Sequence, residues 1–417
     1  MTSAPGHASD IESRYAWLRL LGSFTISTIG GVGMWAIVVA LPAVQAEFGV
    51  LRGGASLPYS LTMLGFVVGV VFMGRLADRF GIVTPVILGT LSLSLGYVLA
   101  AKATSITMLA FIYGGLIGFG SSAMFGPLIA DISLWFERRR GLAIGLCASG
   151  NYFAGAVWPP VVEYFIAQQG WRDTHWGIGL FCLVTMVPLS FVLRRRPPVQ
   201  PPLPQASAGL NKAGAHRPLG LAPNGVQGLL LIAGIACCVA MSMPQVHIVA
   251  YCVDLGYGPA RGAEMLSLML AFGIISRLAS GWILDRIGGL ATLLLGSALQ
   301  GLALTFYLPF DGLASLYVVS AFFGLVQGGI VPSYAFIVRE LFPPEQAGLR
   351  VSVAIAATLG GMALGGWMSG AIFDLTGSYQ AALLNGIAFN LLNVAIIGWM
   401  LLRWRRQRQM GAALAAA

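Results

Sequence analysis

The segment AFGIISRLASGWILDRIG, residues 271–288, places a full positive charge, Arg277, inside an otherwise apolar run. Because an arginine cannot lose its proton in a protein, a buried one needs an acidic partner, a water-filled cavity or a ligand. If the helix ends near Asp285, Arg277 lies eight residues, roughly 12 Å, from that end. A planar guanidinium at that depth can bind a carboxylate through two parallel charge-assisted hydrogen bonds. We predict that Arg277 binds a carboxylate ligand.

A permanent ion pair inside the protein is the alternative role for Arg277. Three acids are available to supply the partner, and each is predicted near one end of its helix: Glu163, Asp131 and Asp254. Substitution by lysine separates the two roles, because lysine keeps the charge but cannot make the paired fork contact.

Two titratable residues, His247 and Asp254, are candidates for proton coupling. A histidine titrates near neutrality, and burial can bring an acid into the same range. The alternatives are a turn residue for Asp254 and a hydrogen-bonded interfacial histidine for His247. The helix count places Asp254 far from Arg277 unless its own helix bends.

Polar and aromatic side chains at mid-depth are candidates for the wall of the Arg277 site. The polar groups can bind a hydroxyl or keto oxygen, and the aromatic rings limit the size of the ligand. Ordinary helix packing is an equally good explanation for each of them. The candidates are Asn151, Phe119, Ser122, Gln327, Tyr334 and Asn385.

Metal and enzyme chemistry find no support in the sequence. The five cysteines lie in or beside apolar runs, without the CxxC and histidine spacing of zinc or haem sites. The four histidines are scattered, and no ATP-binding P-loop is present in the sequence. We expect no cofactor, no metal and no enzymatic activity.

The composition is that of a polytopic membrane protein. Of the 417 residues, 57% are hydrophobic and 9% are charged, whereas soluble domains carry about 25% charged residues. The net charge of +9 would suggest nucleic acid in a soluble protein, but the basic residues form short clusters between apolar runs. We expect a lipid bilayer around the chain and no nucleic-acid partner.

Twelve apolar runs are long enough to cross a membrane, which takes about 20 residues each. They predict an all-α polytopic membrane protein with twelve transmembrane helices. The runs lie at about residues 18–41, 54–76, 83–102, 106–130, 140–166, 174–193, 225–251, 261–285, 290–308, 313–338, 349–373 and 380–402.

The basic residues predict the orientation, with both termini cytoplasmic. With that orientation 19 of the 24 Lys and Arg residues are cytoplasmic, Arg277 is within the membrane, and 4 are outside, namely Arg52, Lys102, Arg172 and Arg261. The positive-inside rule favours this topology over its inverse. The N-terminus has no apolar core with a cleavage site, so we interpret it as a short tail rather than a signal peptide.

The chain divides into two similar halves. GRLADRFG at 74–81 returns as GWILDRIG at 281–288, an offset of 207 residues, and two such halves predict two pseudo-symmetric six-helix bundles with a substrate site between them. A proline-rich linker without apolar periodicity separates the halves. The predicted parts are an N-terminal tail 1–17, a first bundle 18–193, a linker 194–224, a second bundle 225–402 and a C-terminal tail 403–417.

The repeated pattern resembles the loop signature of the major facilitator superfamily. Its residues are Gly74, Asp78, Arg79 and Gly81, and in the second copy Asp285 and Arg286. Gly74 would allow close helix approach, Asp78 would cap or pair at a helix end, and Arg79 would reach a neighbouring helix terminus. We interpret the pattern as a latch for one conformation. This resemblance implies the major facilitator fold.

Within that superfamily the chain resembles the monocarboxylate porter group and its oxalate/formate-exchanging relatives. The similarity lies in WFERRRGLAIGLCASGNYFAG at 135–155 and in the segment 247–288. The resemblance implies a substrate role for Arg277 and a coupling role for Asp254. The chain departs from the animal members, which carry an acid and a lysine in the first helix and an aspartate at the position of Gly273.

The leading hypothesis is a secondary transporter of small organic anions, most simply a proton-coupled lactate- or pyruvate-type carrier working by alternating access. An oxalate/formate exchanger is an alternative, but 351–373 lacks the second cation, a lysine, of those relatives. A drug or metabolite exporter of the same fold is another. We expect a carboxylate and protons as ligands, a monomeric functional unit and a plasma-membrane, bacterial inner-membrane location.

Overall fold

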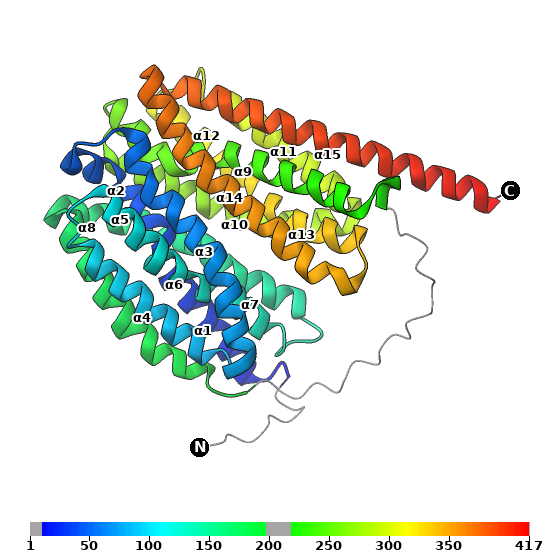
Figure 1. Cartoon of the computed structure of the whole chain (residues 1–417), viewed down its shortest axis with the longest axis horizontal. Coiled ribbons are helices and arrows are strands. Elements are labelled where there is room, and N and C mark those ends of the chain that lie inside the picture. Colours follow the sequence, from blue (N-terminus) through cyan, green and yellow to red (C-terminus); the bar gives the residue numbers. More distant parts are fainter. Residues whose placement is uncertain (1–10, 197–217, 417) are drawn as a thin grey trace.

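The computed structural model describes residues 11–196 and 218–416, and within these residues the structure consists of helices, turns and short connections (Figure 1). We call residues 11–196 the N-terminal group and residues 218–416 the C-terminal group. The helices of the N-terminal group are α1 (Arg14–Gly30), α2 (Val32–Phe48), α3 (Arg52–Phe80), α4 (Val83–Ala100), α5 (Ile106–Ile112), η2 (Tyr113–Gly118), α6 (Phe119–Ser121), η3 (Ser122–Met124), α7 (Gly126–Ile132), α8 (Arg140–Ser190) and η4 (Phe191–Leu193). Those of the C-terminal group are η5 (Pro218–Gly220), α9 (Pro223–Asp254), α10 (Pro259–Ile287), α11 (Gly289–Phe306), α12 (Leu313–Gln327), α13 (Ile330–Leu341), α14 (Pro344–Thr376) and α15 (Tyr379–Ala416).

Eleven helical stretches of the described chain are long and apolar enough to cross a membrane. One of them, 140–193, has 54 residues, about twice what a single crossing needs. Gly170 lies in its middle with φ 81°, a left-handed value that interrupts the helix. The stretch therefore provides two crossings, and residues 11–196 and 218–416 together hold the twelve that the hydropathy pattern predicts.

The predicted tails and linker differ from the structure at their edges. Helix α1 begins at Arg14, inside the predicted tail, and α15 continues through most of the predicted C-terminal tail to Ala416. The residues 197–217, most of the predicted linker with its Lys212 and Arg217, lie outside the described residues.

Glycines allow the helices to approach closely at several places in the described chain. A side-chain carbon at Gly120 would lie 2.6 Å from the carbonyl oxygen of Gly89, and one at Gly361 would lie 2.6 Å from that of Ile235. Backbones in contact at such distances gain packing energy that larger side chains would prevent. The fourth crossing is irregular, because the π-helical segment η2 lies between α5 and α6.

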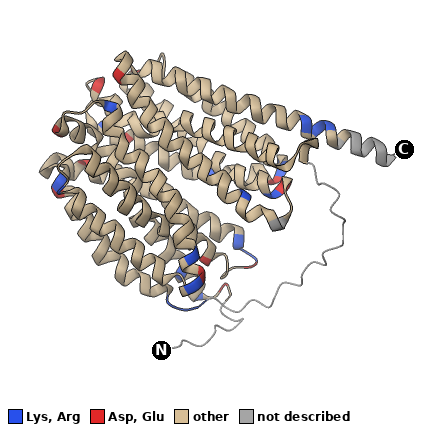
Figure 2. Cartoon of the chain, viewed as in Figure 1, with Lys and Arg blue, Asp and Glu red and all other residues tan. Residues whose placement is uncertain are grey.

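The charged side chains mark the two ends of the helical bundle and leave its middle almost uncharged (Figure 2). Helix α3 runs from Arg52 to Arg79 near its last residue, so these two arginines lie at opposite ends. We call the end that contains Arg52 the predicted outer end and the end that contains Arg79 the predicted inner end.

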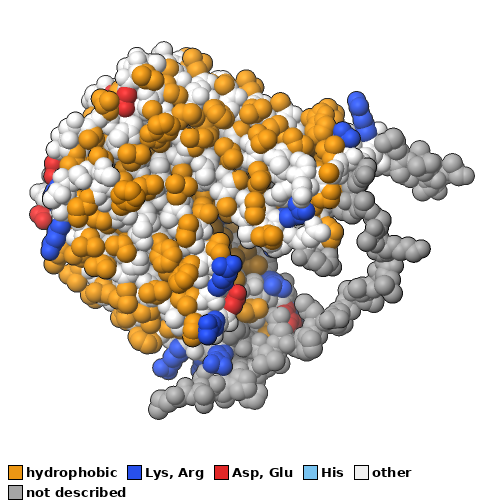
Figure 3. Space-filling view, in the orientation of Figure 1, with side chains coloured by type: hydrophobic (Ala, Val, Ile, Leu, Met, Phe, Trp, Pro, Cys, Tyr) orange, Lys and Arg blue, Asp and Glu red, His pale blue; other side chains and the backbone are white. Residues whose placement is uncertain are grey.

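The two groups of helices meet mainly along α3 with α14 and along α8 with α10. The hydrogen bonds between them, among the described residues, join Arg52 to Asp254, Asp374 and Tyr379, Gly53 to Asp374, Ser60 to Ala363, Ser267 to Ala156, and Arg277 to Ala148. Arg277–Ala148 is the one nearest the predicted inner end, and beyond it the surface between the groups is hollowed (Figure 3). The groups are thus joined at the predicted outer end and parted at the other.

Candidate functional site

Arg277 lies on α10 at the boundary between the two groups. Its Nη1 donates to the carbonyl oxygen of Ala148 on α8 at 3.0 Å, and its Nε donates to that of Gly328 at 3.4 Å. The guanidinium carbon is 4.3 Å from the centre of the Tyr152 ring. Backbone carbonyls and an aromatic face thus orient the charge, since a ring face attracts a cation, but they do not neutralise it.

No carboxylate pairs with Arg277 within the described residues. Asp131 pairs with Arg19 at 2.7 Å and Asp254 pairs with Arg52 at 3.0 Å. Glu163 has no ion pair among the described residues. The predicted alternative, a permanent ion pair, is therefore not formed, and the Nη2 group remains available for an anion.

Tyr152 and Gly273 fit together beside Arg277. A side-chain carbon at Gly273 would lie 2.5 Å from Cε1 of Tyr152, so an ordinary residue at 273 would displace the ring. Gly273 therefore makes room for the ring on which Arg277 stacks. Tyr152, which follows the predicted site residue Asn151, belongs to the site.

The tenth crossing breaks between α12 and α13, at Gly328 and Gly329, beside Arg277. The carbonyl of Gly328 is free for Arg277 because the residue four positions on, Pro332, has no N–H, and Ser276 Oγ accepts from the Gly328 N–H at 3.1 Å. Irregular backbone at this depth is typical of binding sites in membrane proteins, because it is tolerated only where protein or a cavity satisfies it. The paired glycines are the sequence signal for this feature.

Gln327, predicted in the wall, is fully buried at the end of α12. Its Oε1 accepts from Nε2 of Gln245 on α9 at 2.6 Å, while its own Nε2 has no partner. A buried donor without a partner is costly, and it is a candidate partner for a ligand oxygen.

Asn151 lines a cavity of about 10 Å³, roughly enough for one water. Its Nδ2 contacts the sulfur of Met34 at 3.6 Å, and its Oδ1 is buried without a partner. Ser27, Ser121 and Phe125 also line this cavity. The cavity lies inside the N-terminal group, and Asn151 stays a predicted site residue.

The predicted wall residues Phe119 and Ser122 pack against α3. The ring of Phe119 lies 5.5 Å from that of Phe72, and Ser122 is buried where α3 carries Gly69. The hydroxyl of Ser122 donates to the carbonyl of Phe119 at 2.6 Å. In this conformation both side chains serve helix packing, and their substrate role stays a prediction.

Tyr334 and Asn385 also lie apart from the contacts of Arg277. The hydroxyl of Tyr334 donates to Oδ1 of Asn393 at 3.0 Å, and Asn393 donates to Ser297 at 2.7 Å, which forms a buried polar cluster inside the C-terminal group. Asn385 lies half-buried on α15. Their predicted roles remain untested.

Asp254 and His247 belong to a network at the predicted outer end. Asp254 accepts from both terminal nitrogens of Arg52, at 3.0 and 3.1 Å. Tyr379 links Arg52, at 2.7 Å, to Nδ1 of His247, at 3.0 Å, and Nε2 of His247 reaches the carbonyl of Gly366 at 2.8 Å. Helix α9 ends at Asp254, so this acid meets Arg52 and not Arg277.

The motif residues make none of the contacts expected of a latch. A side-chain carbon at Gly74 would meet nothing within 4 Å, so this glycine does not allow a close approach here. Asp78, Arg79, Asp285 and Arg286 are exposed, and the two arginines lie over the neighbouring rings of Phe80 and Trp282. Gly81 and Gly288 end their helices with φ 82° and 81°. The contacts are missing because the two groups part at this end.

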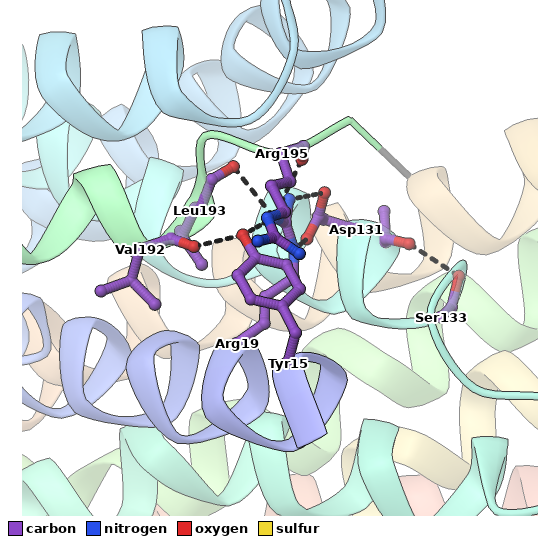
Figure 4. A network of polar contacts seen from close by, with 8 residues as sticks. Tyr15, Arg19, Asp131, Ser133, Val192, Leu193 and Arg195 are labelled. Atoms are coloured by element: carbon purple, nitrogen blue, oxygen red, sulfur yellow. Dashed lines mark hydrogen bonds and ion pairs between the residues drawn. The ribbon is translucent and has the colours of Figure 1, made fainter. Parts of the chain in front are cut away.

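Arg19 lies in α1 and is fully buried inside the N-terminal group (Figure 4). It makes two 2.7 Å hydrogen bonds to Asp131 and donates to the carbonyls of Leu193 and Arg195 at 2.9 and 3.0 Å. The Trp135 ring lies 4.6 Å away. Arg19 therefore ties α1, α7 and the end of the sixth crossing together.

A fold of twelve crossings in two six-helix bundles, with a half-buried cation at their boundary, is that of a polytopic membrane transporter. Residues 23–313 and 280–416 match the family model described as Major Facilitator Superfamily. The chain belongs to this superfamily, whose members are transporters and not enzymes.

Named relatives agree with this assignment. Monocarboxylate transporter 13 of Bos taurus is 29% identical over 82% of this chain and 78% of its own length. The Rattus norvegicus protein of that name is 28% identical over 93% and 89%. The MFS-type transporter pynF of Aspergillus niger is 24% identical over 87% and 81%.

Among solved structures, a bacterial homologue of the human lysosomal transporter Spinster, inward-facing and occupied, has TM-score 0.71 at 15% identity, covering 94% of this chain and 97% of its own. The nucleoside transporter NupG has TM-score 0.73 at 13% identity, covering 92% and 99%. These similarities support the fold alone.

Proposed function

We propose that the protein is a secondary transporter of small organic anions and that Arg277 binds the substrate carboxylate. The observation that carries the proposal is the unpaired charge: Arg277 has two backbone carbonyls and one ring as partners, and no carboxylate among the described residues. A half-buried guanidinium without a counter-charge favours an anion, because surroundings of lower dielectric than water strengthen the attraction.

Two further observations support a monocarboxylate. Several similar proteins carry the name monocarboxylate transporter, including number 11 of Mus musculus, 26% identical over 91% of this chain. One unpaired cation also matches one carboxylate, since 351–373 contains no Lys or Arg to bind a second. A dianion such as oxalate would leave one charge unmatched.

The same proposal includes proton coupling through Asp254 and His247. It also includes cytoplasmic termini, a plasma-membrane location and a monomeric functional unit. Alternating access follows from two bundles divided by the segment 194–224, with each group of helices moving as a unit. The structure is closed at the predicted outer end, so the proposed cycle places it in an inward-facing state.

Uptake by proteoliposomes tests the proposal. Labelled lactate, pyruvate, formate and oxalate are offered with and without an inward proton gradient, to the wild type, Arg277→Lys and Arg261→Lys. Arg261 is a matched control because its ion pair with Glu264 is exposed. We expect gradient-driven uptake of a monocarboxylate that falls at least about 30-fold in Arg277→Lys, because lysine loses the paired hydrogen bonds to the carboxylate. If none of the four acids moves, or Arg277→Lys equals the wild type, the proposal is wrong.

A further inference from the structure

We infer that Arg52 is the gate residue of the predicted outer end, which holds the two groups of helices together there and must release its partners whenever that end opens. The inference rests on the proposed function, since a gate has meaning only in an alternating-access cycle. The sequence predicts only that Arg52 is one of four basic residues on the outer side of the membrane.

The side chain of Arg52 crosses the boundary between the groups. From the first residue of α3 it makes a two-pronged ion pair with Asp254, at the end of α9, and Nη1 also donates to Tyr379 at 2.7 Å. The Phe373 ring lies 4.6 Å from the guanidinium carbon. Every side chain that holds this guanidinium belongs to the C-terminal group.

The backbone at the same residue is held as well. Asp374, near the end of α14, accepts from the N–H groups of Arg52 and Gly53, each at 2.7 Å. A carboxylate there satisfies free amides at the start of α3 and interacts favourably with the helix dipole. Normally such a cap comes from the same helix. Here it comes from the other group, so two acids, Asp254 and Asp374, bind one end of α3 across the boundary.

The packing around Arg52 closes the predicted outer end tightly. A side-chain carbon at Gly370 would lie 2.9 Å from the carbonyl oxygen of Arg52, and one at Gly53 would lie 3.2 Å from the backbone nitrogen of Ala371. Helices α3 and α14 therefore touch by their backbones beside the ion pair. No passage remains between them at this level.

The network can also open without leaving a charge buried. The side chain of Asp254 is 30% exposed, so water can replace Arg52 there once the groups separate. Arg19 and Asp131, whose side chains are 0% and 8% exposed, have no such replacement. A partly exposed ion pair between two moving groups is suited to repeated breakage, whereas a buried pair within one group is not.

Opening at Arg52 also changes the surroundings of both predicted coupling residues, directly for Asp254 and through Tyr379 for His247. Asp254 faces Arg52 and lies close to Tyr379, and the hydroxyl of Tyr379 accepts from Arg52 while it contacts His247. Departure of Arg52 leaves Asp254 without its cation and frees one side of the Tyr379 hydroxyl. The gate therefore connects outward opening to the availability of the two residues proposed for proton coupling.

Distances between spin labels at the predicted outer end test the gate directly. Gln168→Cys and Asp311→Cys place labels on exposed residues of the two groups, while the five native cysteines are buried. We expect Arg52→Gln to raise the population of longer label distances about tenfold in the substrate-free protein, the effect of losing one charge-assisted contact. Exchange of the charges in the double variant Arg52→Asp/Asp254→Arg should restore the short distance in part.

Arg172→Gln is the matched control, because Arg172 pairs with Glu47 at 2.7 Å within the N-terminal group. The inference is overturned if Arg52→Gln keeps the wild-type distances, or if Arg172→Gln lengthens them equally. The readout needs no substrate. If none of the four acids is transported in the uptake assay, the proposed function is wrong. If the label distances stay unchanged, only the inference about Arg52 is wrong.

Discussion

Arg52 and Arg277 lie at the same boundary between the two groups of helices but have opposite surroundings. Arg52 reaches Asp254 with its guanidinium and Asp374 with its backbone, so its region is neutralised and shut. Arg277 has carbonyls and the Tyr152 ring, so its charge is oriented and unmatched. The difference teaches that the partners of an arginine between the two groups indicate its role. We infer that an arginine paired with an acid holds the groups together and that one without an acid binds a ligand.

Arg19 extends the comparison to a fully buried charge that pairs with an acid of its own group, and breaking this pair should have the largest effect. Arg19→Ala leaves Asp131 buried without a cation, which costs about 3–5 kcal/mol. We expect a large drop in thermal stability in detergent. The double variant Arg19→Met/Asp131→Leu removes both charges and should recover most of that stability. An Arg19→Ala protein as stable as the wild type would show that the pair is not structural.

Asp254→Asn tests whether the ion pair between Arg52 and Asp254 takes part in the transport cycle. The neutral amide weakens its hold on Arg52 and cannot carry a proton. We expect accumulation of substrate against its gradient to fall about tenfold, the effect of one charge-assisted hydrogen bond, while exchange of internal for external substrate persists. Counterflow measures exchange and uphill uptake measures accumulation, so measuring both in the same vesicles separates these two activities. Uphill uptake at the wild-type level would contradict both the gate and the coupling role.

Gly273→Ala disturbs the orientation of the unmatched charge without touching it. The new methyl group would lie 2.5 Å from Tyr152 and must push the ring away from Arg277. Overpacking of this kind costs about 1–3 kcal/mol, so transport at low substrate concentration should fall about fivefold or more. Gly281→Ala on the same helix, where nothing lies within 4 Å, is the control. Equal activity of the two variants would mean that the ring contact is incidental.

Tyr152→Leu should give the smallest effect, because it removes only the ring face. A cation over an aromatic ring is worth about 0.5–1 kcal/mol where it is partly exposed, so transport should fall about two- to fivefold. Tyr152→Phe keeps the face and should resemble the wild type. A large loss in the phenylalanine variant would instead assign the hydroxyl to the substrate.

The sequence predicts the fold well because twelve apolar runs and their charged ends act locally. It also singles out Arg277, since a charge inside such a run is visible without a structure. The sequence does not single out the arginines that pair with an acid. Arg19 and Arg52 sit at helix ends like any topology charge, and their acids lie 112 and 202 residues away in sequence. Only the packing of the helices brings these charges together.

Equilibrium binding of a monocarboxylate to the purified protein tests the central claim most directly. Titration calorimetry with pyruvate and lactate compares the wild type, Arg277→Lys and the exposed control Arg261→Lys. We predict that the wild type and Arg261→Lys bind with similar affinity and that Arg277→Lys binds at least about 30-fold more weakly. Equal binding by Arg277→Lys would contradict the claim that this unmatched arginine recognises the substrate carboxylate.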